Sequence, residues 1–299
     1  MRVSIVIPLY KNKELFLTNF AHNIKFIKDY EIIIVDDFSR ENIKESLMKI
    51  FTKAIYLEND QRLGFSKTVN IGCKKAKGDL IILLNTDVKL LRNFSEGLFE
   101  RFSNNHELFG ISFMQIEKDG SRVGKNKIFF KRGLSRHAKV NNVKAGLNAW
   151  LEGGACILRR KVFNELGGLR EIYSPFYWED VDLGYRAYVA GYKILFDPRV
   201  LVEHHHESTI RKYFTRDYIT FIAYRNQFLF TWCNIHDGRY LLEHIFLLPI
   251  TLFEFLLKGE LLGLKGFLSS ILFIPRILAA RNEFSQFRKI KDEEIFTLF

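Results

Sequence analysis

Hydrophobic and polar positions divide the first third of the chain into short apolar runs and longer amphipathic segments. The runs are rich in β-branched and leucine side chains, as buried strands are, and they span Arg2–Pro8, Glu31–Asp36, Ala54–Leu57 and Leu80–Leu84. Residues 16–27, between the first two runs, repeat apolar side chains at helical spacing, and Ser66 is placed to cap a later helix. This alternation predicts an α/β fold with a doubly wound, mostly parallel sheet that binds ligands at the carboxyl ends of its strands.

The pattern loosens from Leu108 onward. We expect Ile111–Ile116 to form an antiparallel addition to the sheet, and the basic residues 118–144 to form a mobile surface segment. A further strand is predicted at Ala149–Leu158, where Gly153-Gly154 permits a close approach of another part of the chain.

The chain after about Arg211 has helical periodicity and is rich in phenylalanine and leucine. Its apolar runs, Ile245–Leu257 and Gly266–Pro275, are shorter than the roughly 20 residues of a membrane-spanning helix. Interleaved basic residues are typical of helices that lie on an anionic membrane surface, and those expected at the headgroups are Lys258, Lys265, Arg276 and Arg281. We predict a catalytic domain at residues 1–210 and a helical, membrane-associating region at residues 211–299, with a hydrophobic cover on the catalytic core as the alternative.

Composition narrows the choice of partners. The 299 residues are 47% hydrophobic, enough for one large core, and carry a net charge of +11. That charge suits nucleic acid, an anionic membrane or a phosphorylated substrate, but no zinc-finger spacing or aromatic RNA-binding motif is present, so we expect no nucleic acid. Cys73, Cys156 and Cys233 lie in apolar or helical surroundings, and no secretory signal precedes them, which predicts reduced thiols in the cytoplasm.

Two acidic clusters carry the candidate chemistry. Asn85-Thr86-Asp87 follows the fourth apolar run, and Trp178-Glu179-Asp180-Val181-Asp182 opens a helix that should end at Gly191. Carboxylates at a helix start can be simple caps. Acidic sites on two separate strand–helix units, however, are what a metal-assisted transfer with a carboxylate base needs.

Several motifs together resemble those of inverting family 2 glycosyltransferases over residues 1 to about 210. They are Ser4-Ile5-Val6-Ile7-Pro8, Val35-Asp36-Asp37-Phe38-Ser39, Gly78-Asp79 leading into Leu84-Asn85-Thr86-Asp87, Gly153-Gly154 and Trp178-Glu179-Asp180. The resemblance implies a GT-A fold, in which a Rossmann-like nucleotide-binding half joins an acceptor-binding half. The sequence is most similar to non-processive, rhamnosyltransferase-type members of surface-polysaccharide synthesis, because the Gln-x-x-Arg-Trp signature of processive synthases is absent.

The resemblance also implies a donor site. Pro8 and Tyr10 would lie against the nucleobase, and Asp37 would accept a hydrogen bond from N3–H of uracil or thymine, which points to a UDP- or dTDP-sugar. Asn85-Thr86-Asp87 stands where the family has an Asp-x-Asp motif that holds Mg²⁺ or Mn²⁺ against the diphosphate. Asn85 lowers the ligand charge there, so Asp87 is the principal candidate.

Asp180 matches the catalytic base of the family. It would take the proton of an acceptor hydroxyl while that oxygen attacks the anomeric carbon from the face opposite the diphosphate, with inversion. The same comparison gives Glu179 and Trp178 a supporting role beside the acceptor, and we expect Asp182 to cap the helix. His204, the first of three consecutive histidines, fits the place of a metal-binding histidine; the alternative is a surface histidine run.

The predicted enzyme moves a sugar to a glycan or lipid-linked glycan acceptor at the inner face of the cell membrane. A dehydrogenase is disfavoured because no Gly-x-Gly-x-x-Gly follows the first strand. A metal-dependent nucleotidyltransferase would need a triphosphate-binding loop that we do not find. An inactive glycan- or membrane-binding module stays open because of Asn85 and the apolar tail, and so does the oligomeric state.

Overall fold

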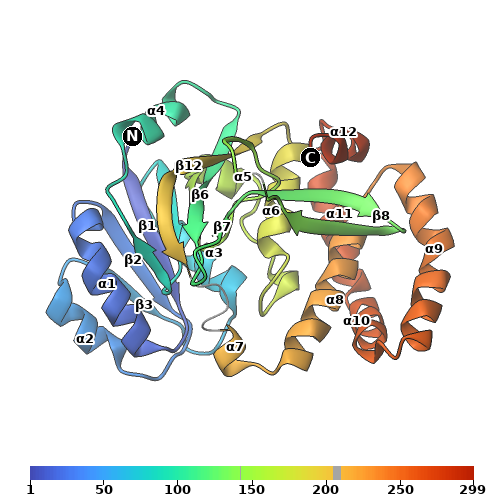
Figure 1. The fold of residues 1–299 in the computed structure, drawn as a ribbon, viewed down its shortest axis with the longest axis horizontal. Coiled ribbons are helices and arrows are strands. Elements are labelled where there is room, and N and C mark those ends of the chain that lie inside the picture. Colours follow the sequence, from blue (N-terminus) through green and yellow to red (C-terminus); the bar gives the residue numbers. More distant parts are fainter. Residues whose placement is uncertain (142, 205–209) are drawn as a thin grey trace.

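A mixed sheet with helices on both faces forms one half of the molecule, and the C-terminal helices extend from it (Figure 1). The computed structural model describes residues 1–141, 143–204 and 210–299. Within them, the sheet has ten strands: β1 (Val3–Leu9), β2 (Glu31–Asp36), β3 (Ile55–Glu58), β4 (Leu80–Leu84), β5 (Val88–Leu90), β6 (Leu108–Ile116), β7 (Arg122–Val123), β10 (Gly146–Leu147), β11 (Ala155–Arg159) and β12 (Lys193–His204). The main order is β10-β12-β6-β11-β4-β1-β2-β3, with β5 on β12 and β7 on β6.

The predicted α/β class is confirmed. Strands β4, β1, β2 and β3 run parallel, and β11 pairs antiparallel with both β4 and β6. Ile32, Ile33, Ile34 and Val35 of β2 are almost completely buried, because side chains on both faces of a parallel sheet are covered by helices. This explains why the strands appear in the sequence as continuous apolar runs.

Helices cover both faces of the sheet. Those of the first two thirds are α1 (Lys13–Ile27), α2 (Ile43–Ile50), α3 (Phe65–Lys75), α4 (Glu96–Ser103), α5 (Arg160–Glu165) and α6 (Glu179–Val189). Phe16 and Phe20 of α1 pack on one face, whereas Val69 and Cys73 of α3 pack on the other. The three cysteines are buried and free, as predicted. Ser66 does not cap α3, because the helix begins at Phe65 after Gly64.

Residues 118–144 differ from the mobile segment expected. Besides β7 they contain β8 (Asn126–Lys131) and β9 (Leu134–Lys139), which pair as an antiparallel hairpin. Apolar side chains such as Ile128 and Leu134 alternate with the basic ones and are buried. This alternation is typical of a strand with one buried and one exposed face, but the many charged residues make it hard to recognise in the sequence. The strand predicted at 149–158 begins only at Ala155.

The end of the chain is helical, as predicted: α7 (Ile210–Tyr213), α8 (Arg216–Asn234), α9 (Gly238–Leu257), α10 (Leu261–Ile271), α11 (Ile274–Ser285) and α12 (Asp292–Thr297). Helix α8 belongs to the core, since Phe228, Leu229 and Phe230 are fully buried. Helix α12 is anchored through Asp292, whose carboxylate accepts hydrogen bonds from the Tyr185 hydroxyl of α6 (2.7 Å) and from the backbone N–H of His236 (2.6 Å).

Helices α9, α10 and α11 expose a broad apolar surface, which we call the apolar platform. Its exposed side chains are Leu242, Ile245, Phe246, Ile250, Phe253, Leu256, Leu257, Leu261, Leu268, Ile271, Leu272, Ile274 and Leu278. The first apolar run is part of the 20-residue helix α9. Only 17% of the most apolar 18-residue stretch of this helix is buried. In the described residues α9 is long and apolar enough to cross a membrane, and so is the bent pair α10–α11 if counted as one span. Length alone therefore does not exclude a spanning helix, contrary to the sequence argument.

Candidate active site

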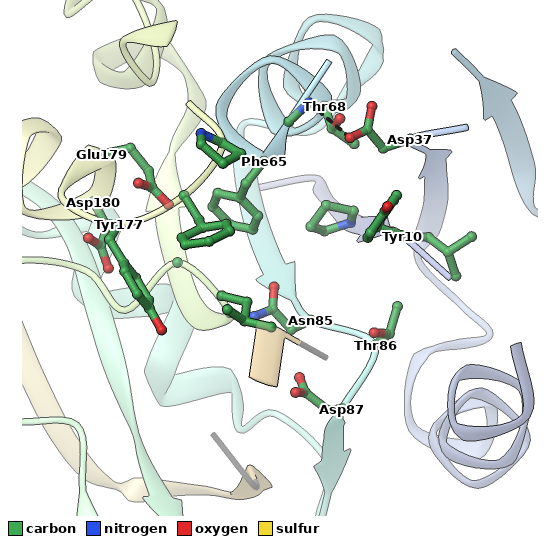
Figure 2. A pocket seen from close by; sticks show the side chains of 18 of the residues that line it. Tyr10, Asp37, Phe65, Thr68, Asn85, Thr86, Asp87, Tyr177, Glu179 and Asp180 are labelled. Carbon is green, nitrogen blue, oxygen red and sulfur yellow. Dashed lines mark hydrogen bonds between the residues drawn. The ribbon is translucent and has the colours of Figure 1, made fainter. Parts of the chain in front are cut away.

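A pocket lies where the carboxyl ends of β1, β2 and β4 meet the start of α6 (Figure 2). Asp37 and Tyr10 lie on one side of it, Glu179 and Asp180 on the opposite side, and Asn85, Thr86 and Asp87 between them. Of the predicted site residues, only Trp178 is not in the lining. The lining residues are Pro8, Leu9, Tyr10, Asp37, Arg62, Gly64, Phe65, Thr68, Asn85, Thr86, Asp87, Glu152, Gly153, Gly154, Pro175, Phe176, Tyr177, Glu179, Asp180, His204, Ile210 and Phe214.

Asp36, the last residue of β2, and Asp37, which follows it, have different structural roles. Asp36 accepts hydrogen bonds from the Ser39 backbone N–H (2.8 Å) and the Tyr56 hydroxyl (2.5 Å), so the local turn with Ser39 is formed by Asp36. Asp37 lines the pocket and accepts hydrogen bonds from the backbone N–H groups of Leu63 (2.6 Å) and Gly64 (2.9 Å). Since each carboxylate oxygen has two lone pairs, Asp37 keeps acceptor capacity for a ligand.

An arginine that the sequence analysis did not single out completes this side of the pocket. The Arg62 guanidinium lies 4.6 Å from the ring centroids of both Tyr10 and Phe214, a geometry in which the ring faces attract the cation. Arg62 precedes α3 in a loop, where a single arginine has no distinguishing signal in the sequence. It gives this side of the pocket a positive charge suited to a phosphorylated ligand.

Asp87 and His204 form the candidate metal site. His204 Nε2 is 3.2 Å from Asp87 Oδ1, and both side chains are buried. The other ring nitrogen, Nδ1, lies 2.5 Å from Gln115 Oε1, an outer contact of the kind that orients a metal-binding histidine. No group of three acidic, histidine or cysteine ligands occurs among the described residues. Two protein ligands are nevertheless sufficient for a cation that also binds phosphate oxygens and water. His205 and His206 lie outside the described residues.

Asn85 lies directly on Gly154, as the predicted close approach requires. Its backbone N–H donates to the Gly154 carbonyl (2.9 Å). A Cβ at Gly154 would come within 2.3 Å of Asn85 Nδ2, so no larger residue fits without displacing the amide. The glycine thus fixes how the Asn85 side chain enters the pocket.

The carboxyl group of Asp180 is in an environment suited to a base. Burial, followed by the nearby Glu152 carboxylate, raises the pKa of Asp180 to about 7. Burial and the Asp180 charge raise the pKa of Glu179 to about 8, and Glu179 Oε2 has no hydrogen-bond partner within the part of the chain that the structure describes. A carboxylate with a pKa near neutrality is a stronger proton acceptor than an ordinary one. Glu152, which the sequence analysis did not select, is therefore part of this acidic wall.

The expected cap at this helix start is wrong, and Trp178 lies away from the pocket. Asp182 does not cap α6 but is fully buried, bonded to Arg186 Nε (2.7 Å), Arg170 Nη1 (3.0 Å) and Asn234 Nδ2 (2.8 Å). Burial alone would raise the pKa of Asp182, but the two arginines hold it below its ordinary value. Trp178 points into the core, where its ring packs against Phe230 at 5.1 Å, because a left-handed turn presents the neighbouring tyrosine to the pocket instead.

Comparison with known proteins identifies the family. Residues 4–167 match the model of glycosyl transferase family 2. Poly-beta-1,6-N-acetyl-D-glucosamine synthase of Staphylococcus aureus is 23% identical over 177 residues, which cover 56% of this chain and 41% of that protein. The chain thus spans less than half the length of this curated relative.

The fold is shared with solved structures, two of which are compared with the chain. They are GalNAc-T7 with UDP, GalNAc and Mn²⁺ (TM-score 0.63, 18% identity, 80% of this chain and 49% of that chain) and mannosyltransferase PcManGT of Pyrobaculum calidifontis with GDP-Man and Mn²⁺ (TM-score 0.54, 12% identity, 95% and 86%). Since the family model covers more than half of the chain, this protein belongs to glycosyl transferase family 2 and has the GT-A fold.

Proposed function

We propose that this chain transfers one sugar from a nucleotide-sugar donor to a glycan acceptor by a single inverting displacement. The observation that carries the proposal is the pocket itself, in which Asp180 lies opposite Asp37 and Tyr10, with Asp87 between them. A base and a diphosphate-binding group on different walls of one pocket leave room for the donor sugar between them. The absence of Gln-x-x-Arg-Trp from the 299 residues supports transfer of one sugar at a time.

The donor proposal is a UDP- or dTDP-sugar bound with Mg²⁺ or Mn²⁺. UDP or GDP-Man with Mn²⁺ is bound by the proteins of similar fold, and here Asp87, His204 and Asn85 offer the oxygen and imidazole ligands that such a cation accepts. When bound, the cation would offset the charge of the departing diphosphate. Asp37 would accept the N3–H of the base, and Pro8 and Tyr10 would contact its ring.

In the proposed reaction, the acceptor hydroxyl oxygen forms a bond to the anomeric carbon while the bond from that carbon to the diphosphate oxygen breaks. The leaving nucleoside diphosphate keeps the electron pair, and the hydroxyl proton passes to the Asp180 carboxylate. Attack from the face opposite the leaving group inverts the configuration. Burial and then the negative charge of Glu152 keep the Asp180 carboxyl group basic, because both favour its protonated form.

The first experiment is a donor screen with product analysis. A thermal-shift panel of UDP-, dTDP- and GDP-sugars with Mn²⁺ selects the donor, since a bound ligand stabilises the folded state. NMR of the product of a glycan acceptor then reports the anomeric configuration. Retention of configuration would overturn the single displacement. Release of pyrophosphate from a nucleoside triphosphate would favour the nucleotidyltransferase alternative, and donor binding without product would favour an inactive module.

For location, we propose that the apolar platform lies on the cytoplasmic membrane face, where a lipid-linked acceptor is within reach. Lys258, Lys265 and Arg276 are exposed beside it and would each gain roughly 1 kcal/mol near anionic headgroups. Arg281, expected there from sequence, instead donates from Nη1 to the carbonyls of Trp232 (2.6 Å) and Ile235 (2.7 Å).

Point variants test this better than removal of residues 211–299, because α8 is part of the core. Phe246→Ser with Phe253→Ser should reduce flotation with anionic liposomes, since the two rings are one heptad apart on the exposed face of α9. Leu298→Ser, an exposed apolar position outside the apolar platform, is the matched control. If the double variant floats like the parent protein, another surface holds the membrane.

A further inference from the structure

The amide of Asn226, on α8, holds the turn that leads into the helix of Asp180. Asn226 is fully buried. Its Nδ2 donates to the backbone carbonyls of Tyr173 (2.8 Å), Phe176 (3.0 Å) and Tyr177 (2.8 Å). An amide nitrogen has two hydrogens, so one of them is shared between two of these carbonyls. The side chain therefore ties together three points of the segment that leads into Trp178.

Arg225 fixes the orientation of that amide. Its Nε donates to Asn226 Oδ1 (3.0 Å), and its Nη2 donates to the Ser174 carbonyl (2.5 Å). A guanidinium can only donate and a carbonyl can only accept, so Oδ1 must face Arg225 and Nδ2 must face the turn. Both residues are buried, and water cannot replace these bonds without opening the structure.

The turn needs such support because its backbone is strained. Tyr177 and Trp178 have φ values of +71° and +75°, in the left-handed region where a non-glycine residue is strained. Glu179 begins α6 directly after them and Asp180 follows. The direction in which the chain leaves this turn therefore determines where the Asp180 carboxylate points in the pocket.

We propose that Asn226, oriented by Arg225, is a positioning residue for Asp180, which makes α8 a part of the catalytic apparatus. The proposal rests on the proposed function, because it takes Asp180 to be the base. Displacement of a reacting group by about 1 Å can lower the rate by about 10²-fold. Loss of the Asn226 bonds should thus lower kcat, whereas donor binding, on the opposite side of the pocket, should change little.

The test compares Asn226→Ser with Gln227→Ser. Serine keeps a hydroxyl but cannot reach all three carbonyls, and the adjacent Gln227 bonds instead to the Ser135 carbonyl of the β8–β9 hairpin (2.9 Å). We expect kcat of Asn226→Ser to fall by about 10- to 100-fold with donor KM within about threefold, and Gln227→Ser to resemble the parent. We also expect the acid limb of the kcat/KM profile to move to lower pH, because a looser turn admits water to Asp180 and lowers its pKa.

Hydrogen exchange of residues 173–182 in the free protein provides a readout that needs no substrate. Faster exchange there in Asn226→Ser than in Gln227→Ser is expected, and unchanged exchange overturns the proposal. If Asn226→Ser does not fold, Asn226→His, which retains a ring N–H donor, takes its place in both measurements. An unchanged kcat and an unchanged pH profile in a folded Asn226 variant also refute the positioning role of Asn226, even when Asp180→Asn abolishes transfer. Should Asp180→Asn remain active, the proposed base is wrong, and the positioning role falls with it.

Discussion

Replacement of Asp180 by asparagine should produce a protein that is less active and more stable. Asparagine keeps the shape of the side chain and can still accept the Val181 N–H (2.8 Å in the parent), but it cannot take a proton. We expect turnover to fall by about 10²–10⁴-fold, the usual contribution of a general base. Donor affinity should stay within about threefold, because Asp180 belongs to the opposite wall of the pocket.

The gain in stability follows from the raised pKa. The shift from 3.8 to about 7 corresponds to about 4 kcal/mol of lost stability once Asp180 is ionised, at about 1.4 kcal/mol for each pKa unit. This value is an upper limit, because Asp180 opens onto the pocket and water there lowers the penalty and the pKa together; we expect about 1–2 kcal/mol. The folded state binds the proton more tightly than the unfolded state. The penalty is therefore absent below pH 4, grows between pH 4 and about 7, and is complete above pH 7.

Urea unfolding at pH 4 and pH 8 checks this reasoning. At pH 8 the free energy of unfolding of Asp180→Asn should exceed that of the parent by about 1–2 kcal/mol, and at pH 4 the two should agree. A difference that is equal at both pH values would mean that packing, not ionisation, distinguishes the variants. An equally stable or less stable variant at pH 8 would refute a strained carboxylate at this position. The parent's kcat/KM should rise with pH through the raised pKa of Asp180, for which about 7 is the upper limit.

Three further substitutions test other parts of the site. Asp87→Ala should weaken donor binding and make it insensitive to Mn²⁺ in calorimetry, with a smaller effect for His204→Ala; Mn²⁺ titrations like the parent's in both would contradict the metal site. Gly154→Ala should displace Asn85 and reduce turnover by about tenfold or more while the protein stays folded, as judged by kinetics and circular dichroism. Asp182→Asn should lower the free energy of unfolding by about 3–5 kcal/mol, because it leaves two arginines buried without their anion; a loss below about 1 kcal/mol would argue against a buried ionic centre.

The sequence predicts well what depends on local pattern. Buried parallel strands give continuous apolar runs, so the ends of β2 and β4, and with them Asp37 and Asp87, were located in advance. The structure brings these residues and Asp180 into one pocket, although their roles stay predictions.

Features that depend on tertiary structure were beyond prediction. Left-handed backbone at Tyr177 and Trp178 has no local signal, so the sequence predicts the tryptophan, and not the tyrosine, at the pocket. Glu152 and Asn226 meet the Asp180 region only through contacts distant in the sequence. The alternating pattern of the β8–β9 hairpin was hidden by its charge.

The contact between Tyr185 of α6 and Asp292 of α12 has a consequence for the order in which the protein forms. The two residues are 107 positions apart, and at about 5–20 residues per second a ribosome needs about 5–20 s to make the intervening chain. During that time the helix of Asp180 lacks α12 as a partner, and the buried Tyr185 hydroxyl lacks its Asp292 acceptor. The nascent chain therefore acquires its catalytic geometry late, after the sheet and the donor side can already fold. We expect the unfinished chain to need chaperones most during this interval, before α12 is made.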